Sequence, residues 1–174
     1  MMKKILFFIT IFGFSTLFSH SVVSLDGSND YLTTTDTTST QPDGDFTISG
    51  WVFLKGDATQ QVFHNELFEI QYQGSYYRQF RINPGGYSTT WGEASINEWH
   101  HIAVTRSSHT NAYDTLYVYV DGKQSLMFAR EQSSTTTFDG TMYLGRDPDY
   151  GEYFRGFMDE FAIWNTVLDS NSVK

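Results

Sequence analysis

The stretch TLYVYVDGKQSLMF, residues 115–128, decides the fold class of this chain. Over residues 116–120, three aliphatic side chains alternate with two tyrosines, which is the period-two pattern of a half-buried β-strand. Asp121 and Gly122 follow at once, and an Asp-Gly pair suits the two central positions of a type I′ turn. The stretch therefore predicts a β-hairpin.

Similar patterns recur throughout the chain. Aromatic residues make up 17% of it, and Thr, Ser, Tyr and Val are frequent, a balance that favours strands. Only residues 167–174 could begin a helix, with Asp169 as its N-cap. Many short strands without a repeat indicate an all-β chain, either a two-sheet antiparallel jelly-roll sandwich or a barrel. Strands are expected at residues 22–25, 31–33, 46–54, 61–64, 67–73, 77–82, 99–105, 115–120, 124–129, 141–144 and 157–164.

The N-terminus resembles a secretory signal peptide over residues 1–21. Two lysines precede an apolar run from Ile5 to Phe18, and small residues at Ser19 and Ser21 surround a candidate cleavage point. The run is short for spanning a bilayer, and an uncleaved membrane anchor is the alternative. We therefore expect a secreted or cell-surface protein, with no membrane insertion after cleavage.

The remaining residues 22–174 are expected to form one domain, since a chain of about 150 residues can sustain its own core. The chain has no cysteine, so no disulfide can stabilise it. Losing the leader's two lysines moves the formal charge from −9 to −11. An acidic chain without a basic cluster argues against nucleic acid and anionic lipid as partners. It is compatible with cations and with neutral ligands.

Six segments, in order, resemble the laminin-G-like (LamG) domains of the concanavalin A-like jelly-roll type found in secreted bacterial proteins. They are LDGSNDYL, DFTISGWV, NEWHHIAVTR, LYVYVDGK, MYLGRDP and YFRGFMDEFAIWNTVL. The resemblance covers residues 22–172 and implies two antiparallel sheets packed face to face, often with a structural calcium at the rim. Because such domains commonly continue with a C-terminal helix or strand, the domain is expected to be truncated at that end. The architecture hosts lectins, adhesion domains, spacers and glycosidases.

Catalytic motifs are not found in the sequence. Glycosidases of this fold place two carboxylates on one strand in the pattern Glu-x-Asp-x-x-Glu, and this spacing does not occur. His100 and His101 are neighbours on an expected strand, so they cannot converge on one ion, and a histidine donating to a backbone carbonyl is the simpler interpretation. His64 and His109 have no visible partner. We predict that the chain is not an enzyme.

RGFMDEFAIWN, residues 155–165, raises the question of a metal. Read as a regular strand, it places Asp159 on the same face as Phe157, Phe161 and Ile163. The resemblance implies that the first and last strands lie close, which would set Asp26, Asn29 and Asp30 beside Asp159. Carboxylates, amides and carbonyls of this kind suit a structural calcium ion. The alternative is that Asp159 accepts hydrogen bonds from backbone N–H groups of that turn.

Aromatic residues in expected loops are candidates for ligand binding. LGRDPDYGEYFRG, residues 144–156, mixes the acids Asp147, Asp149 and Glu152 with tyrosines, which can stack on a sugar or simply form a solvated turn. The aromatic candidates are Tyr76, Tyr77, Tyr87, Trp91, Tyr150 and Tyr153, of which we favour Trp91, Tyr150 and Tyr153. The sequence thus favours a secreted binding module for a glycan or an extracellular protein. A structural spacer is the alternative, and a glycoside hydrolase is a weaker one.

Overall fold

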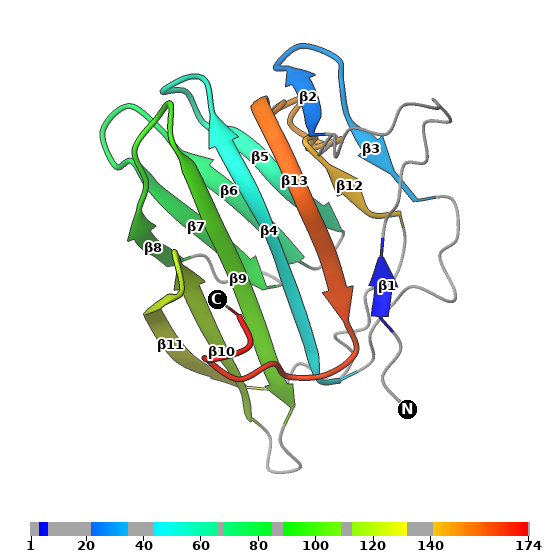
Figure 1. Ribbon diagram of the computed structural model, residues 1–174, viewed down its shortest axis with the longest axis vertical. Coiled ribbons are helices and arrows are strands. Elements are labelled where there is room, and N and C mark those ends of the chain that lie inside the picture. Colours follow the sequence, from blue (N-terminus) through cyan, green and yellow to red (C-terminus); the bar gives the residue numbers. More distant parts are fainter. Residues whose placement is uncertain are drawn as a thin grey trace, which may run out of the picture.

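The computed structural model of the protein describes residues 4–6, 22–34, 44–65, 68–84, 89–108, 113–131 and 141–173. These residues form two antiparallel sheets and no helix (Figure 1). The first sheet contains β1 (Lys4–Leu6), β2 (Val23–Asp26), β4 (Phe46–Leu54), β9 (Trp99–Ser108), β10 (Tyr113–Val120), β11 (Lys123–Glu131) and β13 (Arg155–Trp164). The second contains β3 (Leu32–Thr33), β5 (Gln60–Asn65), β6 (Phe68–Gln73), β7 (Gln79–Pro84), β8 (Thr89–Glu93) and β12 (Tyr143–Leu144).

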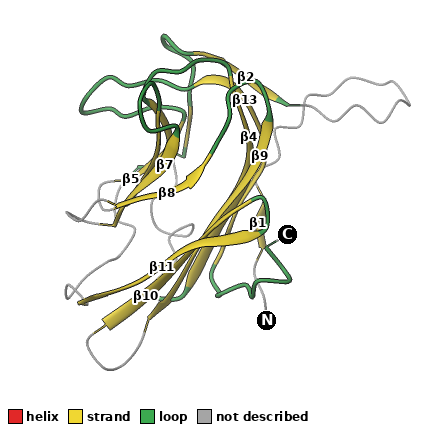
Figure 2. Ribbon diagram, turned by 90° about the vertical axis from the view of Figure 1, so that its left-hand side faces the viewer, coloured by secondary structure: helices red, strands yellow, loops and turns green. Residues whose placement is uncertain are grey.

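The two sheets lie as separate layers, with β4, β9 and β13 on one side and β5, β7 and β8 on the other (Figure 2). In the first sheet the order is β1-β13-β4-β9-β10-β11, with β2 also paired to β13, and in the second it is β3-β12-β5-β6-β7-β8. One cluster of buried side chains from both sheets fills the space between them. This arrangement confirms the predicted all-β, two-sheet jelly-roll sandwich.

The hairpin that decided the fold class forms as predicted. Val120 of β10 pairs with Lys123 of β11, which leaves two residues in the turn. Asp121 has φ of 50° and Gly122 has φ of 70°, and positive φ at both central positions is the requirement of a type I′ turn.

Three local features differ from the sequence prediction or extend it. Strand β8 was not predicted, because TTWGE lacks clear alternation. Residues 167–173, the described part of the segment that could begin a helix, form none, although the Asp169 Oδ1 atom accepts the N–H groups of Asn171 and Ser172 as a helix cap would. The predicted leader lies outside the described residues except for β1, which pairs with β13.

No helix of the described residues is long and apolar enough to cross a membrane.

Strand β13 contains a β-bulge that corrects the sequence interpretation of Asp159. Asp159 pairs with Trp51 of β4, but Ala162 pairs with Ser49, so one extra residue is inserted on β13. Glu160, inside this bulge, has φ of 49°. The extra residue exchanges the two faces of the strand. The prediction that Asp159 shares the face of Phe161 was therefore wrong.

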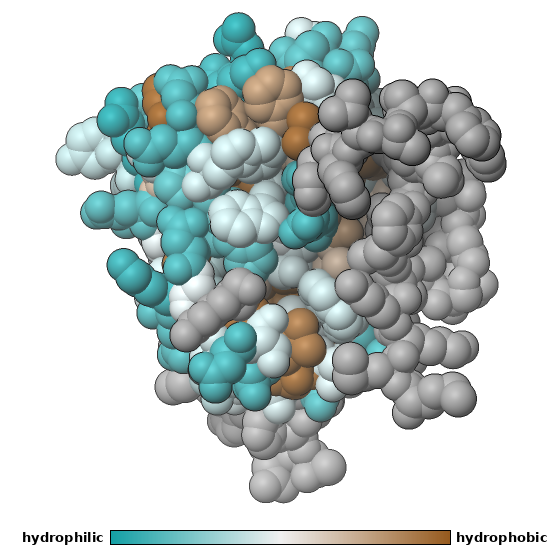
Figure 3. Space-filling model, viewed as in Figure 1, coloured by the Kyte–Doolittle hydropathy of each residue, from teal (hydrophilic) through white to brown (hydrophobic). Residues whose placement is uncertain are grey.

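On the N-terminal side of the bulge, Met158 points into the core and Phe157 points out of it. The Phe157 ring lies 5.6 Å from that of Phe53 and 6.4 Å from that of Trp99, and the Lys55 ammonium lies 3.7 Å above it. Figure 3 shows the surface of the molecule in the same view as Figure 1. Hydrophilic and pale side chains cover most of its coloured part, with small hydrophobic groups between them. Phe157 thus belongs to an outer aromatic cluster, not to the core that the regular-strand interpretation predicted.

We predict that Gly156→Ala strongly destabilises the fold, because a Cβ at Gly156 would overlap the backbone carbonyl oxygen of Phe53. Overpacking and backbone strain together should lower the free energy of unfolding by about 3 kcal/mol or more. Urea denaturation measures this value. Gly151→Ala is the matched control, since Gly151 also has positive φ (69°) but nothing within 4 Å of its added Cβ, and should cost only about 1 kcal/mol. Equal losses of stability for the two variants would contradict the close approach of Gly156 to the Phe53 carbonyl oxygen.

Candidate functional site

The outer surface of the second sheet is polar, and we call it the polar face. Strands β6 and β7 alternate regularly, so Ile70 and Tyr72 of β6 and Phe80 and Ile82 of β7 point into the core. The residues between them point outward, and the polar face consists of His64, Glu69, Gln71, Arg81 and Asn83.

A second β-bulge places His64 on the polar face. On β5, Gln61 pairs with Gln71 of β6, but Phe63 pairs with Ile70, so Val62 is an inserted residue. Without the insertion His64 would point into the core. With it, His64 pairs with Glu69 and lies on the polar face.

The segment from Gly145 to Phe154, which we call the β12–β13 loop, closes on itself beside the polar face. The Gly145 N–H donates to the Val62 carbonyl on β5, and the Phe154 N–H donates to the Gly145 carbonyl. Asp147 fixes the tip of the loop, because its Oδ1 atom accepts the N–H groups of Asp149 and Tyr150 at 2.8 and 3.1 Å. These bonds hold the loop in one conformation.

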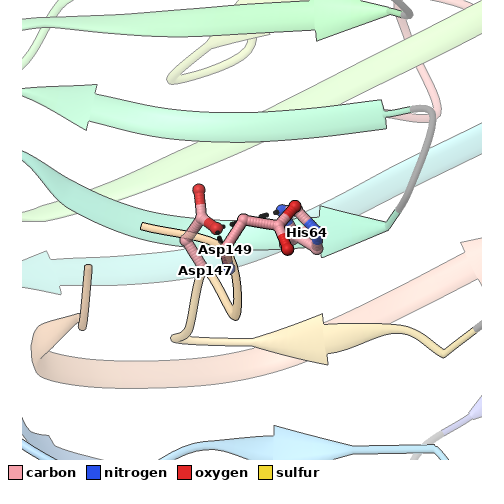
Figure 4. A group of neighbouring side chains, drawn as sticks. All are labelled: His64, Asp147 and Asp149. Atoms are coloured by element: carbon pink, nitrogen blue, oxygen red, sulfur yellow. Dashed lines mark hydrogen bonds and ion pairs between the residues drawn. The ribbon is translucent and has the colours of Figure 1, made fainter. Parts of the chain in front are cut away.

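The β12–β13 loop brings two acids beside His64, as Figure 4 shows. One ligand atom each from His64, Asp147 and Asp149 lies within 4.8 Å of the others. The His64 Nδ1 atom is 3.9 Å from Asp147 Oδ1 and 3.7 Å from Glu69 Oε1, both too long for hydrogen bonds. The side chains of His64 and Asp147 are 5% and 0% exposed, whereas Asp149 is exposed.

Negative charge accumulates around these residues. Burial raises the pKa of the Glu69 carboxyl and Asp147 raises it further, while His64 and Arg81 lower it. Burial also raises the pKa of Glu152, again with Asp147 adding to the effect and Arg81 opposing it. Gln71 donates to Glu152 Oε2 at 3.1 Å, which ties the loop to the polar face.

Tyrosines surround Arg146, the residue before Asp147. The Arg146 guanidinium lies 4.7 Å from the ring centroid of Tyr31, 5.7 Å from that of Tyr143 and 5.9 Å from that of Tyr153. Tyr150, at the tip of the β12–β13 loop, is 81% exposed. The arrangement combines an exposed aromatic ring with carboxylate and amide groups that can hydrogen-bond a polar ligand.

The structure separates the three favoured ligand-binding residues. Tyr150 and Tyr153 both lie in the β12–β13 loop, but Trp91 lies on β8 and is 2% exposed. Its ring packs 5.2 Å from that of Phe80 in the core, so it offers no surface to a ligand. The expectation that Trp91 lies in a loop failed because β8 was not recognised as a strand. Tyr87 lies outside the described residues.

The structure does not bring the four expected calcium ligands together. Asp26 of β2 pairs with Arg155 of β13. Asp159 lies four residues further along β13, so its position on the strand is roughly 13 Å from that of Arg155. Asp159 is therefore at the opposite end of β2 from the turn that contains Asn29 and Asp30. A single calcium ion cannot join these residues, so the expected set does not fit that ion.

Other hydrogen bonds use the same carboxylates. Asp26 Oδ1 accepts the N–H groups of Ser28 and Asn29, which lowers the pKa of Asp26, and Asp30 Oδ2 accepts the Asp26 N–H. Asp159 Oδ1 accepts the Glu160 N–H at 2.8 Å, inside the bulge of β13. A backbone N–H thus satisfies Asp159, as in the alternative considered from the sequence, but that N–H belongs to its neighbour instead of to the distant turn.

His100 makes the backbone contact that the sequence predicted, because its Nε2 atom lies 3.0 Å from the Ser95 carbonyl oxygen.

The cluster of His64, Asp147 and Asp149 was not predicted, although the sequence showed that the loop is acidic. His64 and the loop are about eighty residues apart in sequence, and no local pattern connects them.

A family profile described as the concanavalin A-like lectin/glucanases superfamily matches residues 26–174. The chain belongs to this superfamily and is a LamG-like domain. The comparison with curated protein sequences found no match.

Solved structures share the fold at low sequence identity. A heptameric SAP-like pentraxin from Limulus polyphemus has a TM-score of 0.64 and 14% identity, over 86% of this chain and 78% of the pentraxin. A candidate carbohydrate-binding protein from Bacteroides ovatus has a TM-score of 0.68 and 19% identity, over 87% and 45%. The Trypanosoma rangeli sialidase has a TM-score of 0.59 and 18% identity, over 75% and only 22%. These similarities show the fold alone.

We predict that Asp159→Ala lowers stability equally with calcium and with chelator. The variant loses one hydrogen bond at the bulge, worth about 0.5–1.5 kcal/mol, which corresponds to a drop in melting temperature of roughly 1–6 °C. Calorimetry of the wild type and the variant in both conditions measures the effect. A loss that appears only when calcium is present would restore Asp159 as a calcium ligand.

Proposed function

We propose that this chain is a secreted, non-catalytic module that binds a glycan or an extracellular protein. Of these two ligand classes, the composition of the site favours a saccharide. The observation that carries the proposal is Tyr150, which projects an almost fully exposed ring from a loop fixed by the hydrogen bonds of Asp147. Because the backbone of the loop is already fixed, only the two side-chain torsions of the ring have to be ordered when it stacks on a ligand.

Polar groups near the ring support a saccharide. Glu152 and Gln71 form one hydrogen-bonded pair, and Asp149 is exposed on the same loop as Tyr150. Sugars present an apolar ring face and a rim of hydroxyl groups, so they suit a site of this composition. The carbohydrate-binding description of the Bacteroides ovatus neighbour supports the same ligand class.

The proposal that the module is non-catalytic rests on the missing Glu-x-Asp-x-x-Glu pattern. The purified chain should therefore bind saccharides without releasing reducing sugar from them.

Secretion is proposed from the N-terminal sequence. Cleavage after Ser21 would remove β1, and among the described residues β13 would then keep β2 and β4 as its partners. N-terminal sequencing of material recovered from the culture medium should give Val22 as the first residue. Recovery of a chain that begins at Met1 would contradict the proposal.

A glycan array tests the binding proposal, with the wild type compared against Tyr150→Ala. Removing the ring should weaken binding to any saccharide that the wild type retains by about tenfold, since a lost aromatic contact of about 1.4 kcal/mol is one factor of ten. Tyr76→Ala is the matched control, because Tyr76 is 88% exposed but lies in the turn at the other end of β6 from Glu69. It should bind as the wild type does.

Two results would contradict the proposal. Equal losses for Tyr150→Ala and Tyr76→Ala would remove the β12–β13 loop from the binding site. A blank array, together with no extracellular protein recovered in pull-downs, would favour a structural spacer.

A further inference from the structure

Two atoms of the cluster formed by His64, Asp147 and Asp149 are buried and have no hydrogen-bond partner among the described residues. They are Nδ1 of His64 and Oδ2 of Asp147, and either can donate a lone pair to a cation, which the unpaired Nε atoms of Arg81 and Arg146 nearby cannot. Leaving a buried polar atom unpaired costs about 1–3 kcal/mol, and more for a charged group, so native proteins rarely tolerate it. Two such atoms in one cluster point to a ligand that supplies the missing contacts.

We propose that His64, Asp147 and Asp149 bind a divalent transition-metal ion, with zinc as the best-fitting ion. The separation of 3.9 Å between His64 Nδ1 and Asp147 Oδ1 is too long for a hydrogen bond. The carboxylate thus lies beside the imidazole, close to the roughly 3.4 Å spacing of two ligands on a tetrahedral zinc ion with bonds of about 2.0–2.2 Å. A small rotation of the Asp147 carboxylate would place its unpaired Oδ2 atom on the ion. Asp149, on the exposed tip of the loop, completes a set of three ligand atoms within 4.8 Å of one another, and its exposed side chain can rotate to shorten its distance to the ion.

The surroundings orient the two buried ligands. Asp147 Oδ1 is held by the N–H groups of Asp149 and Tyr150, which leaves Oδ2 for another partner. His64 is held on the polar face by the inserted residue of β5. Ligands fixed in this way by backbone contacts need little rearrangement to bind a metal.

The charge of the cluster favours a cation. Glu69 and Glu152 lie close enough to Asp147 to interact with it electrostatically, and Arg81 is the cation that opposes both. A divalent ion would offset the excess negative charge of these acids.

The donor atoms distinguish zinc from calcium. An imidazole nitrogen with carboxylate oxygens suits zinc and related transition metals, whereas calcium requires six to eight oxygen ligands. This proposal rests on geometry and does not depend on whether the module binds a glycan.

Titration calorimetry of the purified 174-residue chain with zinc chloride, and separately with calcium chloride, tests the proposal. We expect one zinc per chain, tighter binding of zinc than of calcium, and a rise in melting temperature of roughly 5–10 °C at a hundredfold excess over Kd. Asp149→Asn changes an exposed side chain and should fold normally, yet it should weaken zinc binding by at least about tenfold. His64→Gln should do the same.

His101→Ala is the matched control for adventitious binding to histidine, since His101 lies on β9 in the other sheet, and it should retain the zinc affinity of the wild type. Circular dichroism confirms folding of each variant. Three results would each overturn the proposal: no zinc binding, calcium binding tighter than zinc, or zinc binding that Asp149→Asn leaves unchanged.

Discussion

The constraint on which this structure depends is the alternation of side chains between the two faces of each strand. In a two-sheet sandwich one face of every strand is core and the other is surface, so a single inserted residue exchanges these roles for every residue that follows. Among the described residues, register shifts of this kind occur in four strand pairs, and those on β5 and on β13 position His64 and Asp159. One places His64 on the polar face, and the other places Asp159 outside the core.

The bulges on β5 and β13 determine where two polar side chains lie. On β5, the insertion of Val62 buries two consecutive apolar residues and turns His64 toward Glu69 and the β12–β13 loop. On β13, the insertion leaves Asp159 to cap the bulge itself through the Glu160 N–H. The bulge on β5 thus brings polar groups together around His64. The bulge on β13 supplies the backbone N–H that hydrogen-bonds the Asp159 carboxylate.

Much of the fold could be predicted from local patterns, because alternation and turn chemistry are encoded within a few residues. The hairpin at Asp121 and Gly122 and the full extent of β4 are examples. The bulges could not be predicted, since Val62 and Glu160 are ordinary strand residues whose insertion is visible only against the partner strand. The cluster at His64 was missed for a related reason: its members come from distant segments, and only the pairing of β12 with β5 brings them together.

The absence of cysteine allows the alternation on β13 to be measured directly, because single-cysteine variants carry one reactive thiol. In a regular strand, positions 159 and 163 would share a face. Our account predicts that the thiol of Asp159→Cys reacts rapidly with a water-soluble thiol reagent, whereas the thiol of Ile163→Cys, which replaces a buried side chain, is protected until the protein unfolds. Equal reactivity of the two folded variants would contradict the bulge and the assignment of faces that follows from it.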